Sequence, residues 1–254
     1  MVSINNFLGS NNNLNQIDSK GYFTVFEHVS DRSVSKTDAQ TKYFMQKMNC
    51  KLRQIVCRLD GSNSVKLRQG AMQMMIGNVT FNSGVTGVGD YIGKSIKGKV
   101  TGNGAVKPIY YGQGFLITEP TYKYLIIEDV STWGGVVCED GMFLACDGNV
   151  KDRVIARSNL SSAVAGGEGL FNTELSGQGL AVFQSRFPRE ELYEIVLDND
   201  ILKIDGSNAI CWSSSLSFTV ERSGKTLAGS LVSGEGLVNV YRGTGKVLVA
   251  PFLY

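Results

Sequence analysis

Short apolar runs, separated by glycine, asparagine and aspartate, dominate the hydrophobic pattern of the chain. The segments 124–127, 180–183, 192–197 and 246–249 hold four to six residues each and are rich in β-branched and aromatic side chains. Runs of this length favour strands over helices, and the small polar residues at their ends predict tight turns between antiparallel neighbours. The pattern therefore predicts an all-β fold.

One segment near the amino terminus departs from this pattern. Within the run 37–48, Tyr43, Phe44 and Met48 are spaced about one helical turn apart, and the run contains neither glycine nor proline. This spacing predicts one short helix. An additional hairpin arm is the alternative.

Two glycine motifs recur three times in the same order. The first is a pair of Gly-x-Gly triplets followed by an apolar run; its copies begin at 102, 167 and 234, which are 65 and 67 residues apart. The second is an apolar segment that ends at a glycine, 26 to 32 residues before each first motif. The recurrence predicts three related antiparallel β units of about 66 residues. The motif glycines are Gly70, Gly102, Gly104, Gly112, Gly114, Gly141, Gly167, Gly169, Gly177, Gly179, Gly206, Gly234, Gly236, Gly243 and Gly245.

The repeats suggest how the chain is divided. We expect an amino-terminal arm with the first strands in 1–49, and β units in 50–120, 121–186 and 187–254. No long linker separates the units, so we expect one cooperative body.

The motif glycines are interpreted as structural turn residues. A Gly-x-Gly triplet between two strands supplies positive φ angles or close backbone approach at a hairpin corner. The alternative, an anion cradle, is disfavoured because Glu168 and Glu235 lie inside two of the triplets and would repel an anion.

Several of these segments carry a family resemblance. They are Gln-Gly-Ala-Met at 69–72 with Ile-Gly-Asn-Val at 76–79, the glycine motif from 167 to 179, and Gly-Glu-Gly-Leu at 234–237. Over about 50–254 the sequence resembles the altered-inheritance-of-mitochondria family, whose fold is placed with the tryptophan RNA-binding attenuation protein-like (TRAP-like) superfamily. The resemblance implies short double-stranded β-helix-like units and self-association into a ring or trimer. It implies no established biochemical activity, and function does not follow from fold.

Net charge, cysteine content and the length of apolar runs indicate the class of protein. The 254 residues include 25 basic and 23 acidic side chains, and the net charge of +2 argues against a strongly cationic polyanion binder. The five cysteines are odd in number and lie among apolar residues, as expected in a reducing compartment. The sequence has no apolar run long enough for a membrane span, and its first twenty residues resemble neither a secretory nor a mitochondrial leader. We therefore expect a cytoplasmic protein without a transmembrane segment.

Catalytic and metal-binding motifs are weak. His28 is the only histidine, so a nucleophile–histidine system would depend on it alone and a cupin-like metal site would lack further histidine ligands. His28 is interpreted as a half-exposed strand residue. Position 88 is Val, so the Gly-Lys-Ser tripeptide at 93–95 lacks the spacing of a phosphate-binding loop. Cys138 and Cys146 lack zinc-ligand spacing and are interpreted as buried, inert thiols. No cofactor or metal ligand is predicted.

Two further groups of residues are candidates for chemistry. The carboxylates at 119, 128, 129, 139 and 140 and at 190, 191 and 194 are interpreted as a solvated loop face, with acid–base work as the alternative. The stretch 91–118 combines lysines and tyrosines with no acidic residue, a combination that can bind single-stranded nucleic acid. It contains no arginine, so a basic loop plus an ordinary strand remains favoured. The candidate binding residues are Tyr91, Lys94, Lys97, Lys99, Lys107, Tyr110 and Tyr111.

Together these features predict a non-enzymatic, β-rich binding or scaffold protein that forms a homo-oligomer. Repeated units leave open sheet edges, and pairing between subunits can cover them. Single-stranded RNA or DNA binding through 91–118 is the alternative function. An enzyme with a carboxylate or thiol site between the repeats is the second alternative.

Overall fold

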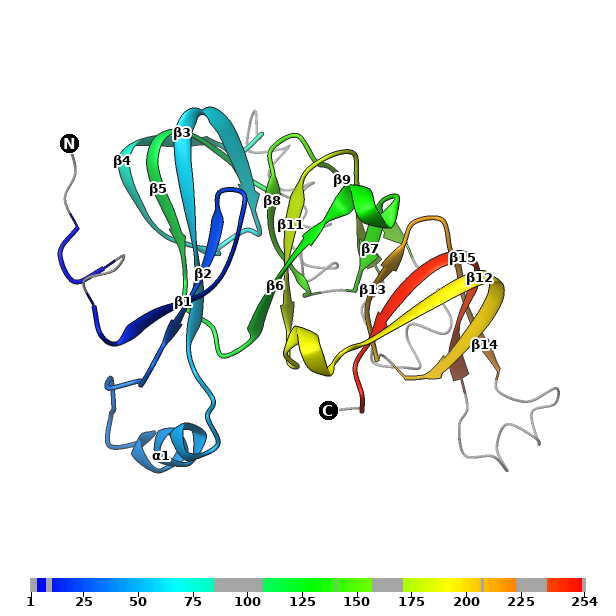
Figure 1. The fold of residues 1–254 in the computed structure, drawn as a ribbon, viewed down its shortest axis with the longest axis horizontal. Helices are drawn as coiled ribbons and strands as arrows, with labels where there is room; N and C mark the ends of the chain where they lie inside the picture. Colours follow the sequence, from blue (N-terminus) through cyan, green and yellow to red (C-terminus); the bar gives the residue numbers. More distant parts are fainter. Residues whose placement is uncertain are drawn as a thin grey trace, which may run out of the picture.

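The fold is almost entirely β-structure. The computed structural model describes residues 4–7, 11–84, 107–139, 141–156, 171–206, 208–222 and 237–252. The strands form two strongly curled antiparallel sheets, and one short α-helix lies outside them (Figure 1). The predicted all-β class and the short helix are confirmed.

The elements follow one another along the chain as short to medium strands joined by turns. They are β1 (Leu14–Lys20), β2 (Phe23–His28), α1 (Ala39–Lys47), β3 (Arg53–Leu67), β4 (Met72–Asn82), β5 (Ile109–Thr118), β6 (Tyr124–Asp129), the 3-10 helix η1 (Val130–Trp133), β7 (Val136–Cys138), β8 (Phe143–Asp147), β9 (Lys151–Ala156), β10 (Phe171–Ser176), β11 (Leu180–Ser185), the 3-10 helix η2 (Arg189–Glu191), β12 (Tyr193–Asp205), β13 (Ala209–Ser213), β14 (Ser217–Arg222) and β15 (Leu237–Val249).

The middle third of the chain contributes strands to both sheets. The eight-stranded sheet has the order β1-β2-β3-β8-β11-β6, with β5 joining β3 and β4. The seven-stranded sheet has the order β12-β15-β13-β7-β10-β9, with β14 on β15. Thus β6, β8 and β11 extend the first sheet, whereas β7, β9 and β10 extend the second. The middle strands therefore bring the two sheets face to face (Figure 1).

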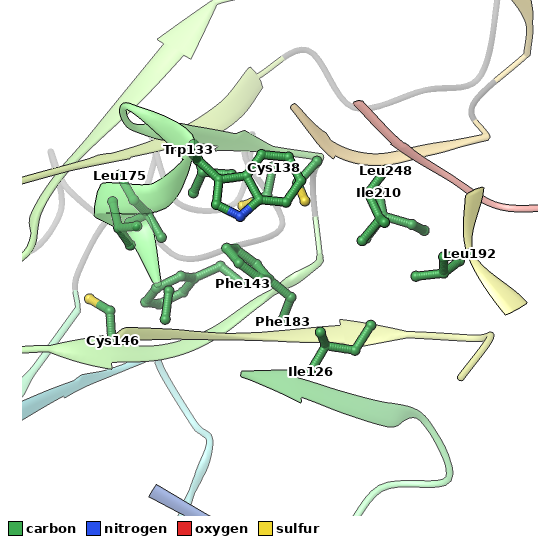
Figure 2. Close-up of a cluster of buried hydrophobic side chains, with 14 of the residues drawn as sticks. Ile126, Trp133, Cys138, Phe143, Cys146, Leu175, Phe183, Leu192, Ile210 and Leu248 are labelled. Carbon is green, nitrogen blue, oxygen red and sulfur yellow. The ribbon is translucent and has the colours of Figure 1, made fainter. Parts of the chain in front are cut away.

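A hydrophobic core fills the space between the sheets in this middle region. Figure 2 shows Phe143 and Phe183, from the first sheet, facing Cys138 and Trp133. Separate clusters fill the curls of the β1–β5 and β12–β15 ends, the second around Trp212. Burial of large apolar side chains is the main stabilising contribution in all three clusters.

The order of elements is consistent with a repeated organisation. The long strand β3 precedes Gly70, the long strand β12 precedes Gly206, and the pair β6 and β7 precedes Gly141. In each case further antiparallel strands follow. The predicted unit boundaries, 1–49, 50–120, 121–186 and 187–254, stay a prediction.

Some motif glycines occupy turns. Gly70, Gly141 and Gly206 follow strands with φ of 76°, 78° and 67°. Gly177 and Gly179, with φ of 98° and 135°, join β10 to β11. The left-handed region is open to glycine at no steric cost. The motif glycines at 102, 104, 167, 169, 234 and 236 lie outside the described residues.

Other motif glycines correct the prediction of hairpin corners. Gly112 and Gly114 lie inside β5, and Gly243 and Gly245 lie inside β15. The reason in β5 is close backbone approach: a Cβ on Gly114 would lie 1.9 Å from the carbonyl oxygen of Ile76 in the paired strand β4. Glycine here permits the strand itself to bend, as at a barrel corner.

The helix α1 lies between β2 and β3 along the chain, within the run 37–48 that is predicted to form a short helix (Figure 1). Its apolar side chains Tyr43 and Phe44, and Met48 after it, are exposed. An ion pair between Lys42 and Asp31 holds the preceding loop. None of the helices in the described part of the chain has the length and apolar character of a membrane span.

Candidate functional site

A groove of about 580 Å³ lies beside β6 in the described structure. One side is formed by β6 and by the start of η2 with the preceding Pro188. The other is formed by Ile17 and Asp18 of β1, Glu27 of β2, Asn49, and Arg53 of β3. This volume lies in the range of ligand-binding clefts in proteins.

The strand β6 is an edge of the first sheet. Among the described strands it pairs with β11 alone. Leu125, Ile126 and Ile127 all line the groove, although their side chains are only 5–8% exposed. Ile126 packs in the middle core, whereas Leu125 and Ile127 pack in the core of the β1–β5 end. Because the side chains are buried on both faces of the sheet, the part of β6 that meets the groove is mainly its main-chain edge.

A buried ion pair forms the opposite wall. Glu27 and Arg53 are partners in the β2–β3 register, and Arg53 Nη2 lies 2.6 Å from Glu27 Oε2. Nη1 of Arg53 donates to the carbonyl of Lys51, and the guanidinium lies 3.9 Å from the centre of the Tyr124 ring. Although Arg53 is only 4% exposed, its Nε has no hydrogen-bond partner within the described structure. One donor of a well-held cation is therefore unsatisfied next to β6.

A second ion pair fixes η2 against the end of β6. Arg189 Nε donates to Glu128 Oε1 over 2.9 Å, and its Nη2 also pairs with Glu194. Trp133 Nε1 donates to the other oxygen of Glu128. Burial alone would lower the pKa of Arg189, but its hydrogen bonds to the two carboxylates outweigh burial and raise it. The position of η2 is thus tied to β6.

Three carboxylates on the groove have no ion-pair partner among the described residues. They are Asp18 on β1 and Glu190 and Glu191 on η2, and all three side chains are exposed. The pairs Glu27–Arg53 and Glu128–Arg189 use the other charged groups of the lining. The groove is therefore negatively charged, although the whole chain has a net charge of +2.

The predicted lysine and tyrosine site is only partly described. Tyr91, Lys94, Lys97 and Lys99 lie outside the described residues. Lys107 Nζ lies 3.2 Å from Asp152, and its side chain is 3% exposed, so it does not offer a free surface charge. Tyr110 is buried beside Phe81, whereas Tyr111 is exposed. The described members therefore do not form one surface.

The partly buried carboxylate of Asp152 forms ion pairs with two lysines. Its carboxylate also lies 2.7 Å from Lys66 Nζ. Burial raises the pKa of Asp152, but the hydrogen bonds and charges of Lys66 and Lys107 outweigh burial and hold that pKa below its ordinary value. This cluster links β3, the residue Lys107 just before β5, and β9, which is a structural role.

The thiols are mostly in the core. Cys57, Cys138, Cys146 and Cys211 are buried, as predicted for Cys138 and Cys146, whereas Cys50 is exposed. Burial raises the pKa of the Cys57, Cys146 and Cys211 thiols. The described residues contain no group of three or more His, Cys, Asp or Glu side chains arranged to hold a metal ion.

Two of the remaining polar groups belong to the sheets. His28 is half-buried on β2, as predicted, and its Nε2 lies 2.9 Å from Gln54 Oε1. Burial raises the pKa of Asp147, whose Oδ2 accepts the Leu180 amide while Oδ1 has no partner in the described structure. Asp147 does not line the groove.

The chain matches a known protein family over most of its length. A family model described as mitochondrial biogenesis AIM24 matches residues 45–252. The chain belongs to the AIM24 family. An uncharacterised protein of Streptococcus pyogenes serotype M6 is 28% identical over 198 residues, which cover 75% of this chain and 78% of that protein.

A solved structure is also similar. The X-ray crystal structure of a Streptococcus pyogenes protein matches with a TM-score of 0.59 and 27% identity. The match covers 82% of this chain and 91% of that chain. The AIM24 family match includes β3, β6 and η2, which supply Arg53, Tyr124 and Arg189 to the groove.

Proposed function

We propose that this AIM24-family chain is a non-enzymatic binding or scaffold protein that holds an extended segment of a partner in the groove beside β6. The single observation that carries the proposal is the main-chain edge of β6, which faces the groove without a partner strand in the described structure. An extended peptide that adds to such an edge supplies the missing hydrogen bonds.

The dimensions suit this mode of binding. The six residues of β6 span about 20 Å at roughly 3.3 Å per residue. Each main-chain hydrogen bond contributes about 0.5–1.5 kcal/mol net, so a few of them support a weak complex without any deep side-chain pocket. The ion pairs at Arg53 and Arg189 hold the two walls in place before binding. This lowers the entropic cost of binding.

Backbone methylation of a peptide tests strand addition. We expect a fluorescein-labelled peptide of alternating Lys and Val, seven residues long, to bind the full chain in an anisotropy titration. Alternate residues of an added strand direct their N–H groups to opposite edges, so only one edge pairs with β6. N-methylation of the valines alone, or of the inner lysines alone, should therefore give one peptide that loses about tenfold or more in affinity and one that binds like the parent.

The two methylated peptides serve as each other's controls because their side chains are the same. If both bind like the unmodified peptide, main-chain pairing is not the mode of binding and the proposed function is wrong.

We also propose that the chain self-associates. The supporting observation is the edge strand β12, which pairs with β15 alone among the described strands and exposes three large apolar side chains. Tyr193, Val196 and Ile201 are 58%, 70% and 52% exposed. An open edge strand can pair with the edge of another chain, and exposed apolar side chains on it favour such a contact.

Sedimentation velocity at micromolar concentration tests self-association. The unmodified chain should sediment as an oligomer, and Val196→Lys with Ile201→Lys should sediment as the monomer. Tyr43→Ser with Phe44→Ser removes exposed apolar groups from α1 and should leave the oligomer intact. A monomeric unmodified chain would contradict this proposal.

The other functional hypotheses stay predictions. A non-enzymatic role is supported by the burial of four thiols and by the ion pairing of two groove carboxylates, Glu27 and Glu128. Single-stranded nucleic-acid binding depends on lysines outside the described residues. The TRAP-like placement, the ring or trimer and the cytoplasmic location likewise rest on the sequence alone.

A further inference from the structure

We infer that the segment held beside β6 is cationic: an extended peptide in which lysine or arginine alternates with apolar residues. This inference rests on the proposed strand addition and adds the chemistry of the partner. It follows from the charge of the groove, the apolar surface next to that charge and the unsatisfied donor of Arg53.

The groove carries negative charge that its own cations do not neutralise. Of the five carboxylates that line the groove, Glu27 and Glu128 are neutralised by Arg53 and Arg189. The remaining three, Asp18, Glu190 and Glu191, have no ion-pair partner among the described residues. They lie on both sides of the groove, on β1 and on η2. Lysine or arginine side chains entering between them would meet negative charge on either side.

Apolar residues near the carboxylates favour apolar side chains at the other positions of the bound peptide. Ile17 is about half exposed on β1, and Pro188 and the ring of Tyr124 are partly exposed on the other side. Side chains of an extended peptide point alternately to its two faces. A segment with cations on one face and apolar groups on the other therefore matches a groove whose rim is acidic and whose walls are partly apolar.

The unsatisfied donor supports a main-chain ligand. Arg53 Nε is buried without an acceptor in the described structure, and the Tyr124 ring lies over the guanidinium. An added strand would bring carbonyl oxygens, which are hydrogen-bond acceptors, to the part of the groove that Arg53 lines. Glu27 and the Lys51 carbonyl already hold the other guanidinium nitrogens, so the cation itself needs no further counter-ion.

Overall electrostatics do not explain such a preference. The net charge of the chain is +2, which would weakly repel a cationic peptide. Preference for lysine over glutamate must therefore come from local charge, and it should weaken as salt screens that charge.

Anisotropy titrations of two peptides test the inference. The Lys-Val peptide should bind at least tenfold more tightly than the matched Glu-Val peptide at low salt, and the difference should shrink at 0.5 M salt, where the screening length is about 4 Å. Glu190→Gln with Glu191→Gln should weaken binding of the Lys-Val peptide about three- to tenfold. Asp60→Asn with Glu119→Gln makes the same change in net charge at exposed residues outside the groove lining and should leave affinity unchanged.

The outcomes separate the two proposals. Equal binding of the Lys-Val and Glu-Val peptides, with sensitivity to backbone methylation retained, would overturn the cationic preference and leave strand addition standing. An equal loss of affinity in the Asp60→Asn, Glu119→Gln control would assign the preference to net charge and would also overturn the inference. A preference for lysine without any sensitivity to methylation would reject strand addition, and with it the inference that rests on it.

Discussion

Gly114→Ala should destabilise the fold by about 3–5 kcal/mol, because backbone strain and a steric clash combine at this position. Gly114 has φ of +150°, and a Cβ there would meet the Ile76 carbonyl oxygen at 1.9 Å and Val79 Cγ2 at 3.0 Å. The residue opposite in β4 is Gly77, so two strands approach each other here without side chains. Relief of the clash requires β4 and β5 to separate, which weakens the ladder that closes this end of the first sheet.

Equilibrium unfolding in urea measures this effect, and Gly61→Ala is the matched control. Gly61 also has positive φ, +95°, but its Cβ would meet no atom within 4 Å. It should cost only about 1–2 kcal/mol, from backbone strain. Since a domain is stable by about 5–15 kcal/mol, the Gly114 variant should unfold at a much lower urea concentration. Equal midpoints for the two variants would show that close approach of β4 and β5 is not what requires Gly114.

Glu27→Ala should destabilise the chain by about 3–5 kcal/mol, because it leaves the buried Arg53 cation without a carboxylate. The Arg53 side chain is only 5% exposed and lies 2.6 Å from Glu27. Lys51 pairs with the same carboxylate at 3.1 Å, so its charge would add to the repulsion once Glu27 is removed. The pair is therefore costly to break, although it need not be strongly stabilising as a pair.

A double variant separates the cost of breaking the ion pair from the net contribution of the pair to stability. Glu27→Leu with Arg53→Met replaces the pair by apolar side chains of similar size and should restore most of the stability lost in Glu27→Ala. Lys51→Ala, which removes a more exposed partner, should cost less than about 1 kcal/mol in the same urea titration. If Glu27→Ala unfolds like the parent, the cation is solvated in solution and the wall of the groove is not fixed by this pair.

Local features of the fold could be predicted from the sequence. Apolar runs of four to six residues indicate strands because their length and side chains suit a half-buried sheet. The run 37–48 contains α1 because it has the spacing of a helix and no helix-breaking residue. The interior position of Gly112 and Gly114 could not be predicted, because it depends on which strand lies opposite, and Gly77 belongs to neither repeated motif.

The groove could not be predicted for the same reason. Its lining runs from Ile17 to Glu191 and meets only because β3 pairs with β8, which brings β11 and β6 beside the first hairpin. The sequence shows that Glu190 and Glu191 are charged. It does not show that they line the same groove as Asp18. A sequence signal did exist at Arg53, a charged residue just before the apolar run 55–57. A charge next to a buried run requires a partner, and the partner, Glu27, lies one strand away.

Amide hydrogen exchange of the full chain, with and without the Lys-Val peptide, tests strand addition at β6. Every second amide of β6 pairs with β11, and the amides between them face the groove. We expect slower exchange for these alternate amides within Tyr124–Asp129 when the peptide is present, with β12 unchanged. Protection that appears elsewhere while β6 exchanges at its original rate would show that the peptide does not add to β6.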